Sequence, residues 1–115
     1  MASDDKPIME VQGFGKQKLI LFKNKIVIQR SGVRQFFLHG LKGDKEIYLK
    51  NISGIQFKKA GTFHNGYIQF DFMGGQQGLG GLWEAVQNEN SVVFSAAQQK
   101  DFEKIKDRME KEIHK

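Results

Sequence analysis

Residues 74–83, GGQQGLGGLW, contain the only tryptophan and enough glycine to cradle a phosphate group. A phosphate loop needs Lys followed by Ser or Thr after its last glycine, because the amine contacts phosphate and the hydroxyl contacts magnesium. Here Gly81 is followed by Leu82 and Trp83. The dinucleotide fingerprint also fails, since its third glycine would fall at Trp83. We therefore interpret this segment as a flexible connection between two strands.

The same segment has an alternative interpretation as a loop that contacts a partner. An aromatic ring near a loop tip supplies a large apolar contact area, and tryptophan is enriched among the residues that dominate protein interfaces. The partner-binding residues predicted by this hypothesis are Gln76, Gln77, Leu79, Leu82 and Trp83.

Basic residues gather in the first part of the chain. Residues 12–70 hold eleven Lys or Arg against two acidic residues, whereas residues 71–99 hold three acidic residues and no basic ones. This asymmetry favours anionic partners, or a second copy of the chain whose acidic region meets the basic one. The candidate anion-binding residues are Lys23, Lys25, Arg30, Arg34, Lys58 and Lys59.

The residues that could perform catalysis form no recognisable constellation. His39, His64 and His114 lie in different elements and lack the i, i+4 spacing of a metal-binding helix. No serine stands in the Gly-x-Ser-x-Gly frame of a nucleophile elbow, and Asp71 has no acidic neighbour in the sequence. We therefore expect a protein that is not an enzyme and uses no metal or cofactor.

The composition indicates one globular domain. A chain of 115 residues can bury one hydrophobic core, and the absence of cysteine excludes disulfides and thiolate chemistry. The acidic N-terminus lacks the apolar run of a signal peptide, and no apolar run is long enough to cross a bilayer. We expect a cytoplasmic domain over residues 13–115, preceded by residues 1–12 as an extension or a first edge strand.

Alternation of apolar and polar residues predicts short strands through most of the chain. Residues 18–22 and 25–30 show this period of two on either side of Asn24, which favours a hairpin. Further strands are expected in residues 45–52, 54–59, 66–72 and 91–94.

The period changes near the C-terminus. Ser95 and Gln98 form a capping-box pattern that marks the start of a helix, predicted over about residues 96–114. Apolar residues then recur every three or four positions and make one stripe. With the strands, this helix predicts a small β-barrel or sandwich of six or seven antiparallel strands, capped at its open end by the helix. The residues of the stripe are Phe102, Ile105, Met109 and Ile113.

This order of elements resembles a pleckstrin-homology-like domain, and more closely a bacterial family of unknown function with that fold. The resemblance is carried by LILFKNKIVIQRSG, KEIYLKNISGIQFKKAG and NGYIQF, then by the glycine-rich loop, EAVQNENSVVF and the helix QQKDFEKIKDRMEKEI. Members of the family often carry a SHOCT-type C-terminal tail, and without one this chain is expected to be a stand-alone domain. The resemblance implies a fold, because the family is largely without an assigned activity.

We expect a non-catalytic binding or assembly module that acts through protein–protein contacts and self-associates. One alternative is that the basic region of residues 16–59 binds anionic lipid or nucleic acid. The basic pattern with which pleckstrin-homology domains bind phosphoinositides is absent, because Ile26 and Val27 follow Lys25. Another alternative is a small inhibitor or adaptor of one cellular protein.

Overall fold

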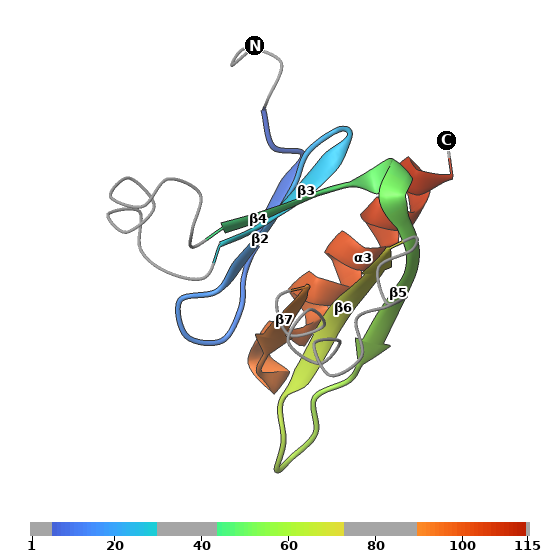
Figure 1. The fold of residues 1–115 in the computed structure, drawn as a ribbon. Helices are drawn as coiled ribbons and strands as arrows, with labels where there is room; N and C mark the ends of the chain where they lie inside the picture. The colour runs from blue at the N-terminus through green and yellow to red at the C-terminus, as the bar shows by residue number, and fades with distance from the viewer. Residues whose placement is uncertain (1–5, 30–43, 73–89, 115) are drawn as a thin grey trace, which may run out of the picture.

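A computed structural model describes residues 6–29, 44–72 and 90–114. Within these ranges the chain forms two antiparallel β-sheets and one C-terminal α-helix (Figure 1). The mainly β architecture with a single helix at the C-terminal end is therefore confirmed for the described part of the chain.

The first sheet has four strands, and its register follows the predicted alternation. The predicted hairpin forms strands β2 and β3, which pair with Leu19 opposite Ile28. Both side chains are fully buried, because every second residue of a strand faces the same side of the sheet. In spatial order the strands are β1 (Met9–Gln12), β2 (Lys18–Leu21), β3 (Lys25–Gln29) and β4 (Asp44–Tyr48).

The second sheet has three strands and also buries alternate residues. Ile68 and Phe70 on β6, and Val92 and Phe94 on β7, are almost inaccessible to solvent, as the sequence pattern predicts. In spatial order the strands are β5 (Ile52–Lys58), β6 (Gly66–Phe72) and β7 (Ser91–Phe94).

A 3-10 turn separates the two sheets. The sequence pattern predicts one continuous strand over residues 45–52, but the chain leaves the first sheet after Tyr48 and turns through η2 (Leu49–Asn51). Leu49 is still buried, so the alternation correctly identified its inward side without revealing the turn. Because of this turn, β5 enters a different sheet from β4.

The barrel alternative is wrong for the described strands. Among the residues that the structure describes, no strand ladder joins the two sheets. Between β4 of the first sheet and β5 of the second, the chain turns through η2. Between the β1–β2 loop and β7, the contact is a backbone hydrogen bond of 2.8 Å from the Phe14 N–H to the Val93 oxygen. The described strands therefore form two separate sheets, of four and three strands.

The C-terminal helix begins where the capping-box pattern predicted. A 3-10 turn, η4 (Ala96–Gln98), leads into α3 (Gln99–Ile113). The Ser95–Gln98 capping box is formed, and the Ser95 N–H donates to the Gln98 Oε1 at 2.9 Å. These contacts satisfy backbone donors that the first turn of a helix would otherwise leave without partners.

The apolar stripe of α3 packs into a core shared by both sheets. Phe102 stacks on Phe94 of β7 with ring centroids 4.6 Å apart, and Phe57 of β5 lies 5.3 Å from Phe94. In Figure 1, α3 lies behind the second sheet, so it covers a sheet face rather than plugging the mouth of a barrel. The buried core residues are Val11, Leu19, Leu21, Ile26, Ile28, Ile47, Leu49, Ile52, Ile68, Phe70, Val92, Phe94, Phe102, Ile105 and Met109.

Candidate functional site

Three chain segments that are distant in sequence meet at one end of the domain. The Gln98 Nε2 donates to the Gly13 oxygen at 2.9 Å, and the Ala60 N–H donates to the Gln99 Oε1 at 2.8 Å. The start of α3 therefore holds both the β1–β2 loop and the β5–β6 loop. We call this surface the loop end and define it as residues 13–17, 58–65 and 95–100.

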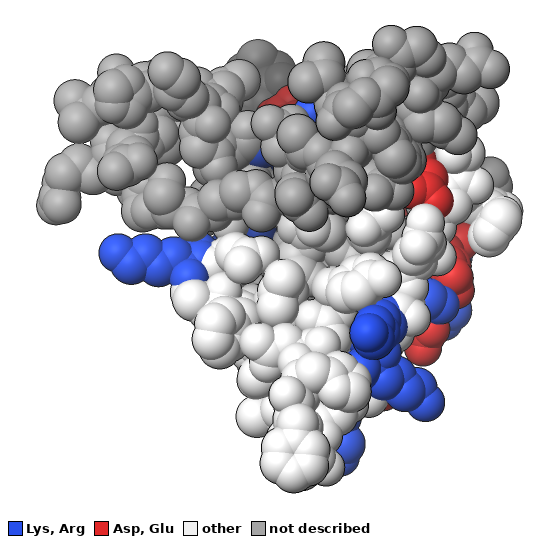
Figure 2. All heavy atoms as spheres, turned by 60° about the horizontal axis from the view of Figure 1, so that its bottom comes forward, with Lys and Arg blue, Asp and Glu red and all other residues white. Residues whose placement is uncertain are grey.

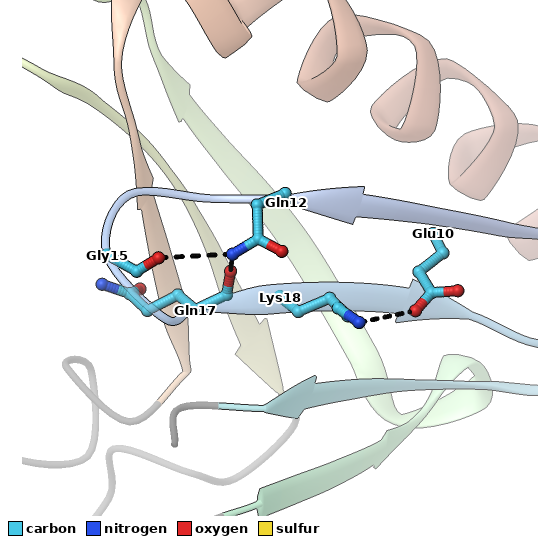
Figure 3. A network of polar contacts seen from close by, with 5 residues as sticks. All are labelled: Glu10, Gln12, Gly15, Gln17 and Lys18. Atoms are coloured by element: carbon cyan, nitrogen blue, oxygen red, sulfur yellow. Dashed lines mark hydrogen bonds and ion pairs between the residues drawn. The ribbon is translucent and has the colours of Figure 1, made fainter. Parts of the chain in front are cut away.

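The β1–β2 loop is shaped by one side chain, that of Gln12 (Figure 3). Its Nε2 donates to the oxygens of Gly15 at 3.3 Å and Gln17 at 2.9 Å. Gly15 has a φ of +69°, a left-handed conformation that glycine adopts without steric cost. Next to the loop, Lys18 and Glu10 form an ion pair of 3.0 Å across the two strands. The loop is therefore held in a defined shape.

Two further hydrogen bonds attach the β1–β2 loop to β7. The Phe14 N–H donates to the Val93 oxygen, and the Val93 N–H donates to the Gln17 Oε1 at 3.1 Å. The Phe14 side chain is left 53% exposed at the domain surface. An apolar ring is thus presented to solvent by a loop whose backbone is fixed at both ends.

The β5–β6 loop presents a second phenylalanine. Phe63 is 96% exposed, which is unusual because burying a large apolar side chain stabilises the folded state. The Gly61 N–H donates to the His64 oxygen at 2.9 Å, closing the turn that carries Phe63. The His64 ring fills the space beside Gly61, where an added Cβ would lie only 2.6 Å from its Cε1 atom. The tip is therefore a compact turn.

A shallow depression of about 320 Å³ lies between this tip and the start of η4. It is formed by the β5–β6 loop together with Ala96, so the η4 turn and the β5–β6 tip are neighbours. The lining residues are Gly61, Thr62, Phe63, His64, Asn65 and Ala96.

The loop end carries positive charge and no carboxylate. None of its three segments contains Asp or Glu. Figure 2 looks toward this end and shows a broad uncharged surface with basic side chains at its edges and most of the visible acidic side chains along one side. At one border of the loop end, Lys59 lines a hollow together with Glu103 and Asp107 of α3. The lysines of the loop end are Lys16, Lys58, Lys59 and Lys100, all of them exposed.

The predicted anion-binding residues are divided between two regions of the domain. Lys23 and Lys25 belong to the β2–β3 hairpin, and Lys23 lines a depression with Glu112 and Ile113 at the C-terminal end of α3. Lys58 instead ends β5, and Lys59 lines a different hollow with Glu103 and Asp107 of α3. Along α3, Glu103 and Asp107 precede Glu112 by nine and five residues, which separates the two regions by roughly 8–14 Å at about 1.5 Å per residue. They do not form one cluster.

Lys25 has a role within the fold. Its Nζ lies 3.1 Å from the Glu46 Oε2 on β4 and 5.3 Å from the centre of the Phe22 ring. Its side chain is only 16% exposed, so its charge is largely directed at these neighbours. Arg30 and Arg34, the remaining predicted anion-binding residues, lie outside the described residues.

The predicted partner-binding loop lies outside the described residues as well. Its contact residues Gln76, Gln77, Leu79, Leu82 and Trp83 all fall between β6 and β7, and their role stays a prediction.

The two exposed phenylalanines are not among the residues that the sequence patterns singled out. Phe14 and Phe63 each stand next to turn residues. Gly13 and Gly15 flank Phe14, and Phe63 lies between Gly61 and Asn65-Gly66. An aromatic residue inside a turn sequence, outside any period-two pattern, was the available signal.

A wider depression of about 400 Å³ lies at the opposite end of α3. Its charged side chains have both signs, since Lys23 and Lys50 face the depression together with Glu112. The last carbonyls of α3 add partial negative charge there. This mixed region is a weaker candidate for anion binding than the loop end. Its lining residues are Lys23, Asn24, Tyr48, Leu49, Lys50, Ile52, Glu112 and Ile113.

The candidate catalytic residues are dispersed over the described structure. His64 is exposed on the β5–β6 loop and His114 is exposed after α3, while the Asp71 Oδ2 accepts a hydrogen bond of 3.0 Å from the Gln56 Nε2. His39 lies outside the described residues. Within the described ranges, no three His, Cys, Asp or Glu side chains are grouped so that they could hold a metal ion.

Comparison with known proteins places the chain in a family. None of the helices that the structure describes has the length and apolar composition needed to span a membrane. No curated protein and no solved structure matches the chain. A family model, described as a domain of unknown function (DUF4429), matches residues 23–110. Because this match covers most of the 115 residues, the chain belongs to the DUF4429 family.

Proposed function

We propose that this chain is a non-catalytic binding module that docks on negatively charged partners through its loop end. The observation that carries the proposal is the composition of that surface, which brings together lysines from three segments and exposed phenylalanines from two of them. None of the three segments contains a carboxylate, and Glu103 and Asp107 lie at the border of the surface beside Lys59. Ammonium groups attract anions over distances of about 10 Å at roughly 0.1 M salt, and apolar rings add contact area once the partner has arrived.

The proposal includes a pleckstrin-homology-like fold. Sheets of four and three antiparallel strands followed by one helix agree with the order of elements in the resemblance described above. An association with a SHOCT-type tail in other members of the family is part of the same proposal. Folds of this kind host many functions, so the binding role rests on the loop end and not on the fold.

Heparin, a soluble polyanion, is a suitable first probe. The variant Lys16→Gln/Lys58→Gln/Lys59→Gln removes three positive charges from the loop end. We expect it to elute from a heparin column at clearly lower salt than the wild type, because exposed charges act through screened attraction.

A matched control removes the same charge elsewhere. Lys23, Lys50 and Lys111 are exposed and lie outside the loop end, so Lys23→Gln/Lys50→Gln/Lys111→Gln changes the net charge equally. We expect a much smaller shift in elution. Equal shifts for the two triple variants would mean that net charge alone governs retention, and the proposal would be wrong.

Self-association is the second candidate function, favoured by the charge asymmetry of the chain. The basic residues 12–70 of one copy would meet the acidic residues 71–99 of another. Such contacts weaken as salt screens the charges. Sedimentation velocity across a salt series should then show a larger species that dissociates as salt increases. A monomer at every salt and protein concentration would exclude this candidate.

A further inference from the structure

We infer that the partner of the loop end is an anionic lipid bilayer, into which Phe63 and then Phe14 insert. This inference rests on the proposed function and adds the class of partner and the mode of contact. Phe63 is 96% exposed and Phe14 is 53% exposed, whereas Phe57, Phe94 and Phe102 pack together in or against the core.

The shape of the β5–β6 loop suits a bilayer. Its tip is a convex turn closed by the Gly61–His64 hydrogen bond and attached to α3 through the bond from Ala60 to Gln99. A ring held on such a turn enters a soft surface without first ordering a flexible segment. Interfacial segments place their apolar side chains about 5–10 Å into the boundary between headgroups and acyl chains, a depth that a protruding side chain can reach.

The lysines of the loop end provide the matching electrostatic attraction. The surface potential of anionic leaflets is negative, and each lysine close to it strengthens binding about fivefold. Lys16 lies in the β1–β2 loop, which carries Phe14. Lys58 ends β5 and Lys59 follows it, just before the turn that carries Phe63. Lys100 lies at the start of α3. Their flexible stems let the ammonium groups stay at the headgroups while the rings lie deeper.

A single-stranded nucleic acid fits this surface less well. Proteins that bind such strands stack successive bases on aromatic rings along a charged groove. Phe63 and Phe14 instead protrude from separate loops, and the depression beside Phe63 is shallow, with its two aromatic residues, Phe63 and His64, adjacent on one tight turn. The arrangement of rings therefore favours insertion over base stacking.

Vesicle co-sedimentation tests the role of the ring. With vesicles of equal parts phosphatidylcholine and phosphatidylglycerol, we expect Phe63→Ala to weaken binding about tenfold, because one apolar side chain no longer leaves water. Phe63→Leu should retain most of the binding. Tyr48→Ala is the matched control, since Tyr48 is 44% exposed but lines the depression at the other end of α3. It should change binding by less than about twofold.

A fluorescent label tests insertion directly. The chain contains no cysteine, so Thr62→Cys provides a unique attachment site beside Phe63, and Lys50→Cys provides one away from the loop end. With an environment-sensitive nitrobenzoxadiazole label, we expect a blue shift and a gain in intensity at position 62 on anionic vesicles. The label at position 50 should not respond, and pure phosphatidylcholine vesicles should bind weakly.

The outcomes separate the two proposals. If the wild type binds heparin and anionic vesicles, but Phe63→Ala binds equally well and the label at position 62 does not respond, insertion is wrong and the proposed function stands. If the wild type binds a single-stranded RNA oligonucleotide and no vesicle, the partner is nucleic acid and the inference is wrong. If it binds neither heparin nor anionic vesicles, the proposed function fails as well.

Discussion

The Phe14 N–H donates a 2.8 Å hydrogen bond to the Val93 oxygen, which attaches the first loop of one sheet to the last strand of the other. The Gln17 side chain accepts from the Val93 N–H in return. The loop end therefore depends on the packing of both sheets, and substitutions at this junction are expected to affect stability as well as binding.

The closest approach at the junction is at Gly13. A Cβ there would lie 2.7 Å from the Val93 oxygen and 2.8 Å from the Val92 Cγ1. We expect Gly13→Ala to lower the free energy of unfolding by about 1–3 kcal/mol, because the buried strand cannot move away easily. Urea denaturation measures this change.

Gly15 provides the control for this substitution. It has a positive φ but nothing within 4 Å of an added Cβ, and asparagine tolerates this conformation. Gly15→Asn should therefore cost less than about 1 kcal/mol. A similar loss in both variants would contradict the role assigned to the close approach at Gly13.

The stacking of Phe102 on Phe94 predicts a large loss of stability on truncation. Phe102 is fully buried, so Phe102→Ala should lower the free energy of unfolding by about 3–5 kcal/mol. The exposed Phe63 is the comparison, and Phe63→Ala should change the free energy of unfolding by no more than about 0.5 kcal/mol. If both substitutions had small effects in chemical denaturation, the helix would not be docked as described.

Gln98 connects the helix start with the β1–β2 loop. Its Oε1 accepts from the Ser95 N–H and its Nε2 donates to the Gly13 oxygen, each at 2.9 Å. Gln98→Ala loses both bonds and should cost about 1–2 kcal/mol in free energy of unfolding. Gln98→Glu keeps the acceptor and loses the donor, so its thermal midpoint should fall between those of wild type and alanine. Identical midpoints for the two variants would show that the cap does not contribute.

Lys25 and Lys58 should respond in opposite ways to neutralisation. Lys25 pairs with Glu46, so Lys25→Gln is expected to cost about 0.5–1 kcal/mol in stability and to change heparin elution little. Lys58 is exposed at the loop end, so Lys58→Gln should leave stability within about 0.5 kcal/mol and lower the eluting salt concentration. The reverse pattern would place the anion-binding surface at the first hairpin.

The spacing of apolar residues correctly predicted which side of each predicted strand and of the helix is buried. Leu19 and Ile28 in the first hairpin, and Phe102 and Met109 on the helix, face the core as their periods of two and 3.6 predict. The turn at η2 was missed because Leu49 lies on the correct side for a continuing strand. Local alternation does not report where a chain changes from one sheet to another.

The amino-acid sequence by itself determined the order of strands and helix, the residues of the core and the excess of basic charge, since each follows from local spacing or composition. The tertiary structure decided which distant residues meet. It separated Lys23 and Lys25 from Lys58 and Lys59 and brought the loops carrying Phe14 and Phe63 to the start of α3. The physical reason is that such neighbourhoods depend on how the two sheets and the helix share one core, and no spacing along the chain encodes that packing.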